Sequence, residues 1–160
     1  GHEVRRLDIG ALGLPPVASA AEFEGPPTHA AALAAQADIT WCDHLVLVHP
    51  LWLGSQPAMV KAFFEQTFRY GFALPKQSAG FPKGLLNGKS ARSIVTMGMP
   101  GFIYRWWFGA FAVRAFETAL FNLSGIRPVR RTLIGGMGAI TPEKAARHLA
   151  AAAELGRRGV

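Results

Sequence analysis

A run of apolar residues without polar alternation, Leu45-Val46-Leu47-Val48, follows Asp43 and His44. Such a run is typical of a strand buried on both faces, as in a parallel sheet covered by helices. The apolar and β-branched stretches 91–96 and 129–134 predict two further strands. The mixed pattern of residues 3–9 predicts a strand near a sheet edge, and the Gly-, Pro- and Ala-rich residues 10–27 predict an irregular connection with a short helical turn.

Helical patterns occupy the segments between these strands. The alanine-rich stretch 28–40 predicts a helix capped by Thr28. A second helix is expected to begin with Pro57 at its first position, capped by Ser55 or Gln56. The spacing of the apolar residues in this helix predicts a buried face and an outward polar face. The predicted buried residues are Met59, Val60, Phe63, Phe64 and Phe68, and the outward ones are Lys61, Glu65 and Gln66.

Two more helices follow. A long aromatic helix is expected over about 106–123, with Gly125 as a left-handed stop before Pro128. The final helix begins at Thr141-Pro142-Glu143, a cap followed by proline at the first helical position. The preceding Gly136–Ile140 segment lacks the third glycine of a dinucleotide fingerprint and is interpreted as a turn.

Alternating strands and helices with a buried parallel sheet predict a doubly wound α/β fold, a three-layer α/β/α sandwich. We expect residues 1–160 to form one such domain. In this architecture a ligand binds beyond the carboxyl ends of the central strands. The loops after Val48 and Thr96 are therefore the candidate site.

Composition narrows the classes of function. The net charge of +7 arises from separated arginine pairs without a nucleic-acid motif, so nucleic-acid binding is not predicted. Arg105, Arg114 and Glu117 interrupt the aromatic stretch, which excludes a transmembrane span. The single cysteine, Cys42, and the lack of a recognisable signal peptide predict a cytoplasmic protein. The histidines show no metal-ligand spacing, so no metal site is expected.

Each candidate loop allows two interpretations. In the first, Trp52 either packs against a flat ligand or fills the core at a tight turn. In the second, Gly98 and its neighbours permit close approach of a ligand to the backbone. Tyr104 either presents its hydroxyl to a ligand oxygen or anchors the start of the following helix.

Two stretches, HPLWLGSQPAMVKAFFEQTFRYGFALP (49–75) and GKSARSIVTMGMPGFIYRWWFGAF (88–111), resemble the signature of the NAD(P)H dehydrogenase (quinone) family. The resemblance implies a flavodoxin-like fold, a bound flavin (FAD or FMN) and NADPH or NADH as the donor. It also implies a catalytic role for Tyr104 in hydride transfer. The residues that it places along the flavin ring are Pro50, Leu51, Trp52, Leu53, Gly54, Thr96, Met97, Gly98 and Met99.

The chain departs from the family pattern in two places. Phe111 stands where relatives commonly carry a histidine, and phenylalanine cannot donate a proton. The match also begins after the family's first strand, phosphate-binding loop and helix, so we expect the domain to lack that unit in the sequence given.

The resemblance implies a flavin-dependent NAD(P)H:quinone oxidoreductase that forms a homodimer, in which the aromatic helix would gain an apolar partner surface. Two alternatives stay open. The first is a non-catalytic or weakly catalytic regulatory subunit, for example of a potassium-efflux system, which Phe111 and the missing first strand–loop–helix unit both favour. The second is a peripheral membrane module that uses the aromatic helix.

Overall fold

A computed structural model describes residues 1–76 and 83–160 of the chain. Its centre is a parallel sheet of β1 (His44–Pro50), β2 (Ser90–Thr96) and β3 (Val129–Ile134). The strands lie in the order β1-β2-β3, with His44 opposite Ser90 and Ala91 opposite Val129. All three predicted central strands are confirmed.

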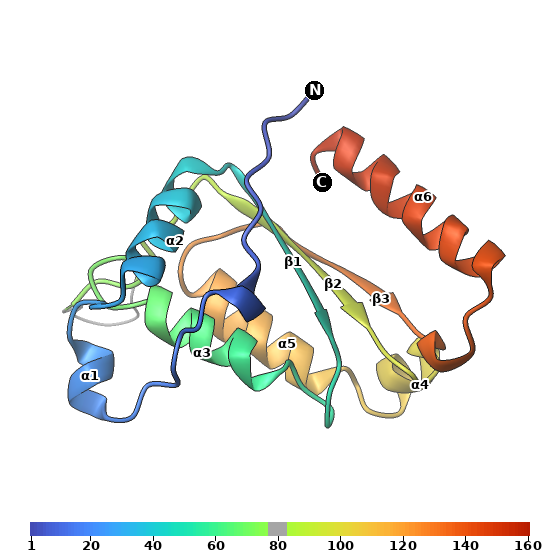
Figure 1. Ribbon diagram of the computed structural model, residues 1–160, viewed down its shortest axis with the longest axis horizontal. Helices are drawn as coiled ribbons and strands as arrows, with labels where there is room; N and C mark the ends of the chain where they lie inside the picture. Colours follow the sequence, from blue (N-terminus) through green and yellow to red (C-terminus); the bar gives the residue numbers. More distant parts are fainter. Residues whose placement is uncertain (77–82) are drawn as a thin grey trace.

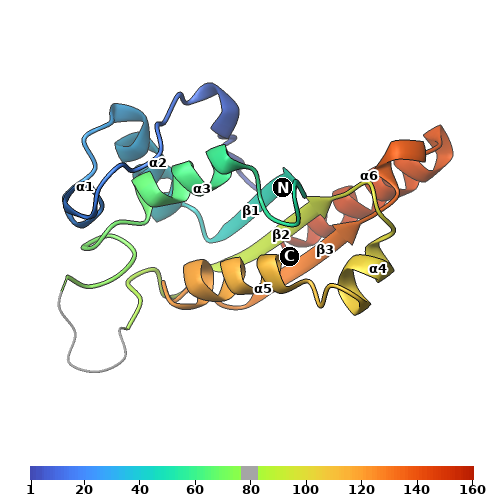
Figure 2. The ribbon, with the colours of Figure 1, turned by 90° about the horizontal axis from the view of Figure 1, so that it is seen from below.

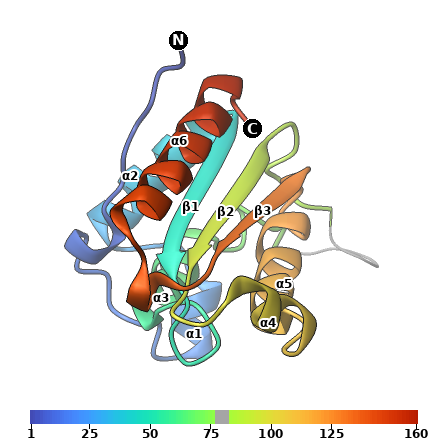
Figure 3. The same cartoon turned by 90° about the vertical axis from the view of Figure 1, so that its right-hand side faces the viewer.

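Helices lie on both faces of this sheet (Figure 1). One face carries α2 (Ala30–Trp41), α3 (Ala58–Thr67) and α5 (Phe111–Glu117), and α6 (Pro142–Arg158) lies over the other (Figure 3). A short helix, α1 (Ala20–Glu24), and the 3-10 turn η1 (Ile9–Ala11) precede α2. The doubly wound α/β prediction is confirmed, as are the irregular connection over residues 10–27 and its short helical turn.

The predicted edge strand at residues 3–9 is wrong. This segment has no strand assignment and continues into η1. In the part of the chain that the structure describes, no other strand pairs with its backbone. Leu7 and Ile9 instead pack against the main core through their side chains.

The single long helix expected over 106–123 is also wrong. The chain forms α4 (Gly101–Trp106), breaks, and then forms α5, followed by the π-helical turn η2 (Thr118–Asn122). The break arises because Gly109 and Ala110 both adopt left-handed backbone conformations, with φ of 59° and 48°. A right-handed helix cannot pass through two such residues.

Of the three predicted helix caps, one is confirmed and two are wrong. The prediction at Thr141 is confirmed, since its side chain accepts a hydrogen bond from the Lys144 backbone and Pro142 opens α6. Thr28 is not a cap, because α2 begins one residue later than expected and His29 holds the N-cap position. Neither Ser55 nor Gln56 caps α3; Pro57 itself occupies the N-cap position.

The main core lies between the sheet and α2, α3 and α5, and aromatic side chains fill it. Phe64 makes edge-to-face contacts with four other phenylalanines: Phe63, Phe68, Phe116 and Phe121. A second, smaller core beside α4 contains Val95, Met97, Tyr104, Ala110 and Val113. This smaller core supports the turn that follows β2.

Two residues of α3 differ from their predicted faces. Met59 is exposed, whereas Gln66, expected in solvent, is completely buried. Gln66 donates to the Pro15 carbonyl and the Glu22 carboxylate, and accepts from the Arg69 guanidinium. The irregular segment before α2 packs over this side of α3 and supplies the polar partners of Gln66. The helical pattern of α3 alone does not predict that another segment buries this side.

The prediction that β1 is buried on both faces is wrong as well. Leu47 and His49 are buried beneath α2 and α3, but Val46 and Val48 on the opposite face are 51% and 63% exposed. α6 lies over that face without a single buried side chain. The apolar run thus indicates a strand correctly, although only one of its faces is covered.

Candidate functional site

A tight turn connects β1 to α3 at the carboxyl edge of the sheet. The backbone N–H of Trp52 donates to the Ser55 carbonyl (2.9 Å), and the N–H of Ser55 donates back to the Trp52 carbonyl (3.0 Å). Leu53 and Gly54 at the tip are left-handed, with φ of 49° and 81°. The side chain of Leu53 stands free of the protein, fully exposed. This turn holds an apolar side chain out at the edge where a ligand is expected.

The conformation of Leu53 has a measurable cost. A left-handed backbone costs an L-residue about 1–2 kcal/mol, and glycine avoids the cost but loses more entropy on folding. Leu53→Gly should therefore raise the free energy of unfolding by about 0.5–1 kcal/mol in urea denaturation. Leu85→Gly, another exposed leucine but without a positive φ, is the control and should not stabilise. A loss of stability in Leu53→Gly would contradict the strained turn.

The turn after β2 lies beside this first turn, because β1 and β2 are parallel neighbours and Pro50 is opposite Thr96. The N–H of Leu51 donates to the Thr96 carbonyl over 2.7 Å. Apart from Gly98 and its two chain neighbours, no residue that the structure describes has an atom within 4 Å of the position that a Cβ at Gly98 would take. The two predicted loops thus meet at one end of the sheet, and the second presents an open backbone.

The loop before α6 is hydrogen-bonded to the turn after β2. Met97 accepts a hydrogen bond from the Met137 backbone (3.0 Å), and Met99 accepts one from the Gly136 backbone (3.0 Å). Gly135 makes this approach feasible, since a Cβ there would lie 2.1 Å from the Gly101 nitrogen. The glycine-rich segment before α6 is therefore a support for the neighbouring turn, which agrees with its interpretation as a turn rather than a fingerprint.

Tyr104 joins the two candidate turns. Its ring is 2% exposed within the smaller core, and its hydroxyl donates to the Gly54 carbonyl across 3.3 Å. Burial raises the pKa of this phenol, so it stays protonated and can keep donating at neutral and moderately alkaline pH. Tyr104 therefore ties the tip of the first turn to the helix that follows the second.

The edge formed by these turns suits a planar ring with polar heteroatoms. Trp52 is 60% exposed and Leu53 projects beside it, so both offer apolar surface. Within residues 1–76 and 83–160, the backbone N–H groups of Leu53, Gly54 and Gly98 have no acceptor. Unpaired donors beside apolar side chains are what a flavin ring requires, with its carbonyl and nitrogen acceptors.

The ten predicted site residues differ in accessibility. Trp52, Leu53, Gly54 and Gly98 are exposed, whereas Met97 and Tyr104 are buried. Pro50, Leu51, Thr96 and Met99 are partly buried between these groups. The structure thus brings all the predicted loops together, with a few accessible residues supported by a buried layer.

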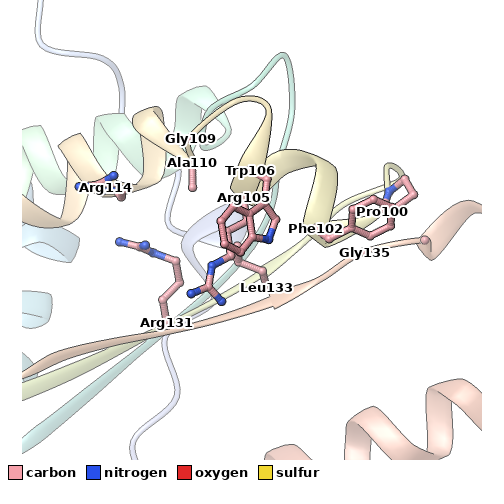
Figure 4. A pocket seen from close by; sticks show the side chains of 12 residues that line it. Pro100, Phe102, Arg105, Trp106, Gly109, Ala110, Arg114, Arg131, Leu133 and Gly135 are labelled. Carbon is pink, nitrogen blue, oxygen red and sulfur yellow. The ribbon is translucent and has the colours of Figure 1, made fainter.

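A large cavity of about 950 Å³ lies beside this edge, and none of the ten predicted residues lines it. It is bounded by α4, α5 and β3, and Figure 4 shows Arg105, Arg114 and Arg131 around it. The sequence does not reveal this cavity, because its arginines come from three separate elements. Gly109 and Ala110, at the unpredicted break between α4 and α5, also line it.

Among residues 1–76 and 83–160, no three or more His, Cys, Asp or Glu side chains gather as a metal site would require. Over the same residues, the helices are all too short or too polar to span a bilayer.

The family of this chain is identified by comparison with known proteins. A family model described as "Flavodoxin-like fold" matches residues 1–157. The chain belongs to this family. The resemblance to NAD(P)H dehydrogenases of quinones, inferred from the two sequence stretches, is thereby confirmed at the level of the family.

Relatives of this flavodoxin-like chain include an uncharacterized NAD(P)H oxidoreductase of Haemophilus influenzae. The two are 32% identical over 99 residues, covering 61% of this chain and 48% of the relative. The chain spans about half or less of the length of the curated relatives that it matches.

Solved structures share the flavodoxin-like fold. A protein of Streptococcus mutans UA159 superposes with a TM-score of 0.79 at 25% identity, over 95% of this chain and 81% of that one. An FMN-dependent NADH-azoreductase of Bacillus anthracis, solved in complex with FMN, superposes with a TM-score of 0.66 at 15% identity, over 89% and 73%. The second likeness shows the fold alone.

Proposed function

We propose that this protein is a flavin-dependent NAD(P)H:quinone oxidoreductase. The observation that carries the proposal is the pair of open turns at one edge of the sheet, joined by the bond from Tyr104 to Gly54. Their unpaired N–H groups and exposed apolar side chains fit a flavin ring. Membership of a family whose relatives include NAD(P)H oxidoreductases supports the same chemistry.

In this proposal the chain's residues position the ring on two sides. The turn 50–54 lies along one side, with Trp52 and Leu53 excluding water, and the turn 96–99 lies along the other. A flavin held there would supply the chemistry of hydride transfer between a nicotinamide donor and a quinone-type acceptor. The proposal leaves FMN or FAD open, and FMN, which an azoreductase of the same fold binds, is the flavin used in the tests.

The catalytic role of Tyr104 stays a prediction, and the hydrogen bond to Gly54 supports a positioning role. Tyr104→Phe removes the hydrogen bond between α4 and the Gly54 carbonyl of the first turn. This loss should weaken flavin binding about three- to tenfold. If the hydroxyl acts only through the turn, saturating flavin should restore kcat. A kcat that stays low at saturating flavin would show instead that the hydroxyl takes part in hydride transfer.

A homodimer is the proposed assembly. Aromatic side chains gather around the break between α4 and α5, and three of them are exposed without lining the cavity beside it: Trp107, Phe108 and Phe111. Exposed aromatic clusters of this kind mark protein interfaces. Sedimentation velocity would support the proposal with a dimer mass, and a monomer at all concentrations would overturn it.

The experiment that tests the activity is anaerobic mixing of the flavin-loaded protein with NADPH or NADH. The flavin's visible absorbance should bleach, and it should return when a quinone is added. Heat-denatured protein with the same amount of flavin is the control. A protein that binds flavin but does not bleach faster than the control would contradict the proposed oxidoreductase.

A second candidate is a flavodoxin-fold regulatory subunit with little or no catalysis. Two observations favour it: Phe111 offers no proton, and the hydroxyl of Tyr104 is buried and engaged with Gly54. The same experiment separates the two candidates, because a regulator would bind flavin or nucleotide without turnover.

A further inference from the structure

The cavity beside α4 carries positive charge that is not neutralised locally. Arg105 of α4, Arg114 of α5 and Arg131 of β3 line it, and no carboxylate does so among the residues described. The carboxylate of buried Glu117 accepts from both the Nε and the Nη2 of Arg131, one of the three lining arginines. Three guanidinium charges less this one carboxylate leave a charge of +2 (3 − 1).

Arg105 and Arg114 are the available cations. Neither has an ion-pair partner within the described part of the chain, whereas the Glu117 pair fixes the direction of Arg131. Figure 4 shows Arg105 and Arg131 reaching into the space between α4 and β3 from opposite sides, with Arg114 nearby on α5. Guanidinium groups so arranged suit a phosphate, which accepts paired hydrogen bonds from arginine.

The rest of the lining is aromatic and apolar. Trp106 and Phe102 form one wall, and Leu133 lies on the strand opposite them. The guanidinium of Arg105 lies 5.8 Å from the centre of the Trp106 ring, close enough for a cation–π contact. An indole and a phenyl ring offer faces on which a planar base can stack.

The size of the cavity favours more than a lone anion. At about 950 Å³ it is far larger than inorganic phosphate and lies at the upper end of the range for organic ligands, about 300–1,000 Å³. A phosphate monoester dianion would balance the charge of +2, and an attached ring would fill the aromatic side. We propose that this cavity is a second binding site, for a nucleoside phosphate, separate from the proposed flavin edge.

The proposed site does not depend on the flavin proposal. The predicted flavin residues do not line the cavity, and the cavity's cations do not belong to the two turns. Two sources could supply the ligand: a free nucleotide, or the adenosine phosphate part of the nicotinamide donor. The shared chemistry is a phosphate group attached to a nucleoside.

The test is calorimetric titration of AMP into the protein, with and without saturating FMN. Adenosine and ribose 5-phosphate are the matched probes, since each lacks one half of the ligand. AMP should bind about tenfold or more tightly than either. Arg105→Gln and Arg114→Gln should each weaken AMP binding by about tenfold, since each removes a charge-assisted contact to phosphate. Trp106→Ala should lower AMP binding towards that of ribose 5-phosphate.

Arg147→Gln is the control variant, because it removes the same charge from an exposed position on α6. It should leave AMP binding unchanged. Equal weakening by Arg147→Gln, or ribose 5-phosphate binding as tightly as AMP, would overturn the proposal. Loss of FMN binding in the Arg105 and Arg114 variants would also overturn it, because the cavity would then be the flavin site.

Titration of NADPH distinguishes the two sources. Weaker NADPH binding in Arg114→Gln, measured by calorimetry without flavin or acceptor, would identify the donor's adenosine phosphate as the ligand. Unchanged NADPH binding together with weakened AMP binding would identify a free nucleotide. Both results support a nucleoside phosphate site, and neither requires turnover.

Discussion

Replacing Phe121 by alanine is expected to lower the free energy of unfolding by about 3–5 kcal/mol. Phe121 is completely buried and makes edge-to-face contacts with Phe64, Phe68 and Phe116. Truncation removes the ring and leaves a cavity in the centre of the aromatic core. Since small domains are stable by only about 5–15 kcal/mol, this loss is a large part of the total.

Urea denaturation followed by circular dichroism measures this effect, and Leu149→Ala is the control. Leu149 is 71% exposed on α6, so its truncation should change stability by less than about 0.5 kcal/mol. Equal losses from the two variants would show that the ring of Phe121 does not lie in the core.

A methyl group added at Gly135 should destabilise the protein by about 3 kcal/mol and weaken flavin binding. The new Cβ would lie 2.1 Å from the Gly101 nitrogen and 2.6 Å from the Met99 oxygen. Both contacts are with backbone, so no side-chain rotation can relieve them. The loop before α6 must then move, and the turn over residues 96–99 loses its support.

Gly138→Ala is the control for this variant, because Gly138 lies in the same loop. Beyond its own chain neighbours, no atom of residues 1–76 and 83–160 lies within 4 Å of the Cβ position at Gly138. Its unfolding midpoint and flavin affinity should stay close to those of the original protein. If Gly135→Ala is as stable as Gly138→Ala, the close approach of the two loops is wrong.

The sequence predicted the arrangement of the sheet well because its signals are local. Apolar runs such as 45–48 identify strands wherever they pack, and Pro142 after Thr141 marks a helix start by its backbone chemistry alone. Parallel strands joined by helices then bring the loops after β1 and β2 to the same edge. The position of the candidate flavin site follows from this topology.

The predictions that failed depended on partners distant in the sequence. Residues 3–9 resemble a strand but lack a neighbouring strand, and Gln66 is buried only because residues 15 and 22 reach it. The left-handed pair Gly109-Ala110 was hidden because alanine rarely adopts that conformation. The arginine-lined cavity opens beside this break, so it could not be predicted either.

The central claim is that the turns at Trp52 and Gly98 hold a flavin ring, and a flavin titration of Gly98→Val tests it most directly. The space around Gly98 is open and its φ is not positive, so valine should fold normally and occupy the space of the ring. Fluorescence titration with FMN should show about 10- to 100-fold weaker binding than in the original protein, with unchanged binding in Gly138→Val. Unchanged FMN affinity in a folded Gly98→Val protein would contradict the account.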